Sequence, residues 1–152
     1  MLVERLRDLP PGMLSDLVDE AERAGLRFPG RLATEWASGV NRFDRPGEAL
    51  FAARAGSRVI GMCGLNVDPY TTAPRVGRVR HLYVLEAHRC DGVGRRLVEA
   101  VIEAARGSFD RLRLRTNNPA AARLYEALGF SRCSEADCTH ALDLCGGGTK
   151  KA

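Results

Sequence analysis

The chain carries the stretch RCDGVGRRLVEAVIEAAR at residues 89–106, and this stretch decides the fold. Gly92 and Gly94 leave the backbone open to close approach by an anionic ligand, because glycine has no side chain. The residues that follow repeat with a helical period, and their apolar face is Val93, Leu97, Val98, Val101, Ile102 and Ala105. A helix that begins near Gly92 would point its first amides at such a ligand. We interpret the stretch as a pyrophosphate cradle flanked by Arg89 and Arg95, with a helix that ends at Gly107.

Other phosphate-binding motifs fit this glycine pair less well. A P-loop needs a Gly-Lys-Ser/Thr ending, but the only lysines are Lys150 and Lys151. A dinucleotide fingerprint needs a third glycine where this chain has Leu97. An ordinary tight turn also contains glycine pairs, so the segments around the cradle must decide.

Two strands and a second helix are predicted around the cradle. Residues 79–85 and 111–115 both alternate like strands, one before the cradle and one after its helix. Asn117 or Asn118 caps the next helix, with Pro119 at its first position. Its apolar stripe, which ends before Gly129, is Ala121, Leu124, Tyr125 and Leu128.

The ordered set of these motifs resembles the GNAT superfamily of acyl-CoA-dependent N-acetyltransferases. The resemblance rests on residues 82–84, 89–94 and 118–130, and it is strong over roughly residues 76–131. Glu86 stands where many relatives have proline, and Cys90 where many have glycine. The resemblance implies an α/β fold with a mixed, mostly antiparallel central sheet flanked by helices on both faces.

The same resemblance implies acetyl-CoA as co-substrate and places its binding residues. The pyrophosphate would lie on the amides of the cradle, and the pantetheine arm would lie beside the first strand and near Asn118. The resemblance also implies that neighbouring parallel strands separate near there so that the arm can enter. The implied cofactor-binding residues are Leu82, Tyr83, Val84, Arg89, Cys90, Asp91, Gly92, Val93, Gly94, Arg95, Asn118 and Tyr125.

In such an enzyme an amine attacks the thioester carbonyl directly. The Val84 amide is the family-based candidate for the oxyanion, and Tyr125 matches the tyrosine that acts as general acid in relatives. Tyr125 also fits a core position on a helix stripe. For the base, Glu86, His81 and Asp68 stay open, and Glu86 is the one we include among the catalytic residues.

The acceptor is not defined by the sequence, because nearby charges conflict. The acids Glu35, Asp44, Glu48 and Asp68 would attract an amine, whereas Arg75, Arg78 and Arg80 favour a substrate that carries a carboxylate or phosphate. The rival to an N-acetyltransferase acting on a primary amine is a CoA-binding sensor or interaction module with weak chemistry.

The rest of the chain predicts further elements of one domain. Helices are expected at residues 13–21 and around Leu32, Trp36 and Val40, after Pro29-Gly30. Strands are expected at 49–55 and 59–67, joined at Gly56-Ser57, at an edge up to Leu9, and at 139–144. We expect a single acetyltransferase domain over 1–145 and a disordered tail over 146–152.

Composition excludes several other classes of function. The net charge of +4 comes from scattered arginines without stacking aromatics, which disfavours a nucleic-acid partner. No apolar run reaches the ~18 residues of a membrane span, and no signal peptide is visible, so we expect a cytoplasmic protein. Cys133, Cys138, His140 and Cys145 lack a Cys-x-x-Cys spacing, so no metal is expected. A homodimer is compatible with the family.

Overall fold

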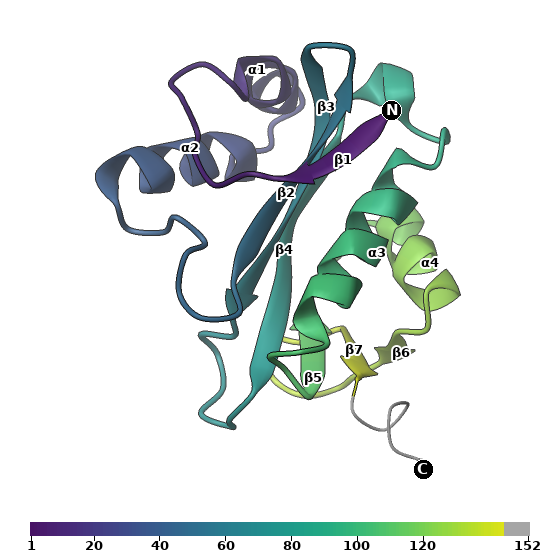
Figure 1. Cartoon of the computed structure of the whole chain (residues 1–152). Coiled ribbons are helices and arrows are strands. Elements are labelled where there is room, and N and C mark those ends of the chain that lie inside the picture. The colour runs from purple at the N-terminus through teal and green to yellow at the C-terminus, as the bar shows by residue number, and fades with distance from the viewer. Residues whose placement is uncertain (145–152) are drawn as a thin grey trace.

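The computed structural model describes residues 1–144, which form seven strands, four α-helices and one short 3-10 helix (Figure 1). In chain order they are β1 (Leu2–Arg5), α1 (Ser15–Arg23), α2 (Phe28–Ser38), β2 (Ala49–Ala55), β3 (Arg58–Val67), β4 (Val76–Val84), η1 (Glu86–His88), α3 (Val93–Ala105), β5 (Arg111–Leu114), α4 (Pro119–Ala127), β6 (Ser131–Arg132) and β7 (His140–Asp143).

The strands form one mixed sheet in the order β1-β2-β3-β4-β5-β7-β6. Every neighbouring pair is antiparallel except β4 and β5, which are parallel and are connected through α3. A parallel pair needs such a crossover, which is why the cradle helix lies between these two strands in sequence. The expected mixed, mostly antiparallel sheet is confirmed.

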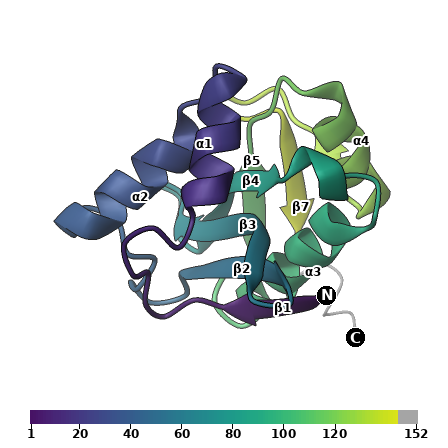
Figure 2. The ribbon, with the colours of Figure 1, turned by 90° about the horizontal axis from the view of Figure 1, so that it is seen from above.

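Helices cover both faces of the sheet, as expected. Helices α1 and α2 lie on one face, and α3 and α4 lie on the other (Figures 1 and 2). Strand β3 is buried between the two layers along almost its whole length, which explains its continuous apolar run. Leu65 and Met62 of this strand are fully buried, as are Leu97 and Val101 of α3.

The second helix differs from its predicted form at both ends. It begins at Phe28, so Pro29 and Gly30 lie within its first turn rather than before it. It ends at Ser38, where Gly39 adopts a left-handed φ of 84°. Val40 therefore lies beyond the helix and is 74% exposed, so its predicted place on the apolar stripe is wrong.

Most other boundaries agree with the predictions within a few residues. Strand β1 is shorter than expected and ends at Arg5, whereas β6 and η1 were not anticipated because each has only two or three residues. The predicted tail, residues 146–152, lies outside the described residues. Among residues 1–144 there is no helix with the length and apolarity that crossing a bilayer would require.

Candidate active site

The parallel strands β4 and β5 pair over only three residues and then separate. Val76–Arg78 pair with Arg111–Arg113, and the described part of the chain supplies no further partner on that side of β4 up to Val84. The register of β4 against β3 also shifts between Met62 and Gly64, where His81 adopts a left-handed φ of 62°. Such a bulge bends a strand, and here it accompanies the separation from β5. The separation expected from the family resemblance is therefore present.

The backbone of Val84 faces this opening. Leu85 N donates to Ile60 O at 2.9 Å, so the backbone N–H and C=O of Leu85 point towards β3. Because the two sides of an antiparallel strand alternate, the N–H and C=O of Val84 point away from β3. The Val84 carbonyl accepts a hydrogen bond from Arg89 Nε at 2.8 Å on that side. The Val84 amide can therefore donate a hydrogen bond to the oxygen of a thioester in this opening.

The cradle has the expected free amides at the start of α3. Gly92 is the N-cap, with a left-handed φ of 80° and no side chain to cap the helix. The first bond into the helix runs from Arg96 N to Gly92 O at 3.1 Å, so the amides of Val93, Gly94 and Arg95 have no helical acceptor. Asp91 is exposed, and its amide belongs to the same turn.

The next helix shows the opposite arrangement at its start. The Asn118 side chain accepts hydrogen bonds from Ala120 N at 2.9 Å and from Ala121 N at 3.2 Å. Asn118, rather than Asn117, is therefore the cap of α4, and its oxygen is engaged in that role. A contact between Asn118 and the pantetheine arm stays a prediction.

Gly94 joins the cradle to the end of β4 and to α4. A Cβ atom at Gly94 would lie 3.3 Å from Leu124 Cδ2 and 3.8 Å from Val84 Cγ2. A side chain at position 94 would require the Leu124 methyl to shift by a few tenths of an ångström, so the glycine favours close packing here as well as ligand approach. Leu82, on the same strand as Val84, is partly buried and packs against the core.

The two flanking arginines are paired with glutamates. Arg89 Nη2 lies 3.7 Å from Glu20 Oε1, and its guanidinium lies 5.2 Å from the centre of the Tyr83 ring. Arg95 Nε forms an i,i+4 pair with Glu99 at 3.2 Å. The attraction of the cradle for an anion therefore depends mainly on backbone amides and the helix dipole.

Replacing Gly92 by aspartate should weaken CoA binding about 10-fold relative to asparagine at the same position. Both residues tolerate a left-handed conformation, and a Cβ at Gly92 meets no atom within 4 Å, so the two variants differ mainly in charge. Titration calorimetry at low and high salt measures the difference, which should shrink as salt screens it. Equal affinities of the two variants at low salt would contradict an anion site here.

Cys90 carries strain that its family counterpart avoids. Its φ is 70°, a left-handed value that costs a non-glycine residue about 1–2 kcal/mol. We expect Cys90→Gly to raise the free energy of unfolding by about 1 kcal/mol, since the flexible unfolded chain offsets part of the relief. Urea unfolding measures this change, and a destabilised variant would show that the cysteine side chain contributes more than its backbone costs.

Tyr125 is buried on α4 beside the sheet, with 5% of its surface exposed. Its ring packs edge-on against Phe130 at 5.4 Å, and burial, with a smaller contribution from Cys63, raises its pKa. Within residues 1–144 its hydroxyl forms no hydrogen bond, and it is not among the fully buried polar atoms that lack a partner, so it retains some contact with solvent. A neutral, unpaired donor suits a hydrogen bond to a departing thiolate.

The three residues considered as the base have different surroundings. Asp68 is buried between Arg78 Nη1 at 3.4 Å and Arg113 Nε at 3.5 Å, which commits its carboxylate to a structural network. His81 packs against Phe28 and Phe43, and burial lowers its pKa to about 4. Glu86 is exposed and has no ion-pair partner among the described residues. Only Glu86 combines a free carboxylate with a position next to Val84.

Sequence reasoning missed Glu20 of α1. Its Oε1 accepts hydrogen bonds from the Tyr83 hydroxyl at 2.7 Å and from Glu86 N at 2.9 Å. These contacts fasten α1 to the end of β4, directly before the cradle. The bond from Tyr83 is the main reason that the pKa of Glu20 is lowered, while burial raises the pKa of Tyr83 to about 12. No local pattern signals this contact, because Glu20 occupies the polar side of an ordinary amphipathic helix.

Comparison with known proteins agrees with this geometry. The model of the acetyltransferase (GNAT) family matches residues 13–130. The chain belongs to the GNAT acetyltransferase family. Acetyl-CoA is the co-substrate that this family uses.

Individual GNAT proteins resemble this chain over different lengths. N-alpha-acetyltransferase RimI of Mycobacterium tuberculosis is 34% identical over 87 residues, which cover 57% of this chain and 54% of that protein. The chain thus spans about half the length of this curated relative. A candidate acetyltransferase from Exiguobacterium sp. 255-15 has a TM-score of 0.85 at 27% identity, covering 99% and 98% of the two chains.

A more distant structure shares the fold alone. Ribosomal-protein-alanine N-acetyltransferase from Brucella melitensis has a TM-score of 0.66 at 18% identity, covering 94% of this chain and 96% of its own. The GNAT arrangement of sheet and helices is thus shared over nearly the whole described chain.

Proposed function

We propose that this GNAT protein transfers an acetyl group from acetyl-CoA to a primary amine by direct attack of the amine on the thioester. One observation carries the proposal: the uncapped start of α3 lies beside the opening between β4 and β5, into which the Val84 amide points. A diphosphate at the amides of α3 would direct the rest of the cofactor along β4. Gly94 lies close to both Val84 and Leu124, since a Cβ atom there would be 3.8 Å and 3.3 Å from their side chains, so the cradle adjoins the end of β4.

Three groups then have distinct roles in the reaction. The Val84 amide donates to the oxyanion that forms when the amine attacks. The Tyr125 hydroxyl donates to the sulfur of the departing CoA thiolate, and its raised pKa keeps it protonated at neutral pH. Glu86, exposed beside the end of β4, takes the proton that the amine loses, directly or through water.

The chemistry favours an α-amine over a lysine side chain as acceptor. An α-amine has a pKa near ~7.8, so a useful fraction is neutral at physiological pH, whereas lysine has a pKa near ~10.4. An exposed carboxylate such as Glu86 is a weak base, and it suffices only where little deprotonation is required. The name of the curated relative, an N-alpha-acetyltransferase, points to the same class of amine.

An assay of thiol release with matched peptides tests this function. One peptide has a free α-amine and no lysine, and its partner has an acetylated start and one lysine. We expect saturable turnover with the first and at least about 10-fold less with the second, given their different neutral fractions. Tight CoA binding without turnover on either peptide or on small amines would favour the rival, a CoA-binding module.

Glu86→Gln should lower the rate on the free α-amine, because the glutamine amide cannot take the proton that the amine loses. An unchanged rate would remove Glu86 as the base.

A further inference from the structure

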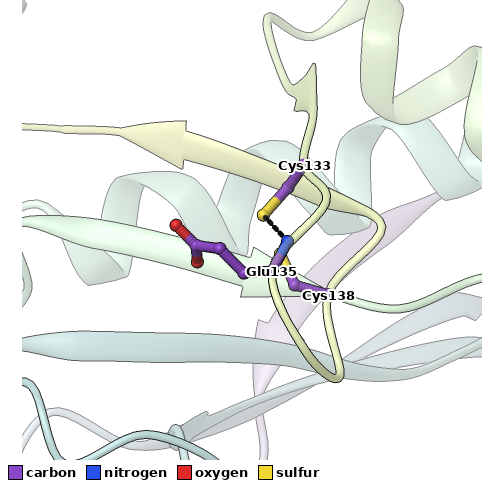
Figure 3. A group of neighbouring side chains, drawn as sticks. All are labelled: Cys133, Glu135 and Cys138. Atoms are coloured by element: carbon purple, nitrogen blue, oxygen red, sulfur yellow. Dashed lines mark hydrogen bonds between the residues drawn. The ribbon is translucent and has the colours of Figure 1, made fainter.

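The loop between β6 and β7 gathers three potential metal ligands outside the active site. One ligand atom each from Cys133, Glu135 and Cys138 lies within 4.8 Å of the other two (Figure 3). The three side chains come from one six-residue segment, and Figure 3 shows the hydrogen bond that Glu135 N donates to Cys133 Sγ at 3.5 Å. Nothing in the acetyltransferase chemistry uses this group.

The loop is held in shape by two buried arginines. Arg78 Nη2 donates to Asp137 O at 2.8 Å, and Arg113 Nη2 donates to Ala136 O at 2.5 Å. Both guanidinium groups are fixed in turn by Asp68. Cys133 N also donates to Thr139 O at 2.9 Å, which closes the base of the loop. These contacts fix the backbone of the loop. The thiols have contacts of their own, since Cys133 Sγ accepts from Glu135 N at 3.5 Å and Cys138 Sγ donates to His140 O at 3.3 Å.

The charges around the loop can accommodate a divalent cation. Glu135 is paired with Arg111 at 3.1 Å and lies 4.0 Å from Arg113, so its negative charge is balanced already. When a divalent ion displaces the protons of two thiols, the two new thiolates balance its charge. The net charge of the region then stays the same, and no uncompensated charge is created.

The ligands differ in burial in a way that suits entry of an ion. Cys133 and Glu135 line an open hollow of about 460 Å³ on this side of the sheet, whereas Cys138 is buried behind them. The hollow supplies a path from solvent and room for a water molecule as a fourth ligand. Two sulfur ligands favour a thiophilic ion and disfavour Mg²⁺ or Ca²⁺, which prefer oxygen.

We propose that Cys133, Glu135 and Cys138 bind a thiophilic divalent cation such as Zn²⁺, with water completing a tetrahedron. This assignment differs from the sequence-based expectation of no metal, which rested on the missing Cys-x-x-Cys spacing and on a predicted terminal strand. The ion would tie the β6–β7 loop together, so its effect would be on stability rather than on acetyl transfer.

A disulfide between the two cysteines is the main competing use of these thiols. A disulfide forms only under oxidising conditions, whereas a metal ion binds the reduced thiols and displaces their protons. Metal uptake by the reduced protein therefore distinguishes the two uses.

Cobalt(II) substitution under a non-thiol reductant tests the site directly. The test uses full-length protein in which Cys90 and Cys145 are replaced by serine. Cys63 is then the one cysteine left outside the cluster, and it is fully buried. We expect one equivalent of Co²⁺ to give thiolate charge-transfer absorption and the visible bands of a tetrahedral ion, and Zn²⁺ to displace it. Cys133→Ser and Cys138→Ser should each weaken binding more than about 100-fold, above the usual effect of losing an outer contact.

Matched variants separate a site from a folding defect. Ser134 lies in the same loop and is exposed, so Ser134→Ala should leave the cobalt spectrum unchanged. The metal should raise the thermal unfolding midpoint of the parent protein and of Ser134→Ala, but not of either cysteine variant. The absence of metal uptake by the reduced parent protein, or uptake that the cysteine variants retain, would overturn the assignment. Formation of a Cys133–Cys138 disulfide without any metal uptake would do the same in favour of a redox pair.

Discussion

Tyr125→Phe is expected to lower kcat by about 10²–10⁴ while CoA binding and folding stay close to those of the parent protein. The variant removes only the hydroxyl, which has no partner among the described residues and is kept protonated by its raised pKa. The thiol of CoA resembles a cysteine thiol with a pKa near ~8.5, so the departing thiolate gains most from a strong hydrogen bond.

The measurement is steady-state turnover at several pH values, with the CoA dissociation constant determined in parallel. Tyr70→Phe is a matched control, because Tyr70 is exposed, lies under Arg78 and precedes β4, whereas the cradle follows the other end of that strand. It should leave kcat unchanged. Full turnover of Tyr125→Phe across the pH range would show that Tyr125 has only a packing role.

The free energy of unfolding should fall by about 3 kcal/mol at most as pH decreases from about 6.5 to about 4, because of His81 alone. Burial, which is the largest cause, lowers the pKa of folded His81 to about 4, whereas an unfolded histidine titrates near ~6.5. Between these two pKa values His81 is protonated in the unfolded chain and neutral in the folded protein. The contribution of neutral His81 is therefore complete above the unfolded pKa and is lost as pH falls through the folded one.

Urea unfolding of the parent protein and of His81→Gln isolates this effect. Carboxylates such as Glu20 and Glu135, whose pKa values are lowered, weaken the fold in the same direction, but only at still lower pH. The comparison is therefore cleanest between about pH 6.5 and about pH 5, where His81 should account for about 2 kcal/mol. The His81→Gln variant should lose this slope, and parallel curves for the two proteins would contradict a buried neutral histidine.

The cradle and its helix were predictable because their signals are local. The glycine spacing and the helical period of residues 92–105 depend on near neighbours, and so does the Asn118-Pro119 start of α4. The family resemblance added the separation of β4 from β5, which no periodicity indicates. The structure then showed that both flanking arginines are paired. Glu99, the partner of Arg95, lies one turn along the same helix, whereas Glu20, the partner of Arg89, is distant in sequence and could not be predicted.

The missed features all depend on tertiary contacts or on a single backbone angle. Glu20 meets Tyr83 across 63 residues of sequence, so no local pattern could indicate that bond. Val40 continued a helical period that Gly39 ends with one left-handed turn. Cys133 and Cys138 lack a familiar metal spacing, and only the folded hairpin brings them together with Glu135.

Amide NMR during a titration with CoA is the most direct test of the central claim, that backbone N–H groups at the start of α3 hold the cofactor pyrophosphate. The account predicts that the largest shifts occur at the amides of residues 90–95, and that pantetheine, which has no pyrophosphate, leaves them in place. Binding of CoA that moves other amides while these six stay unchanged would contradict it.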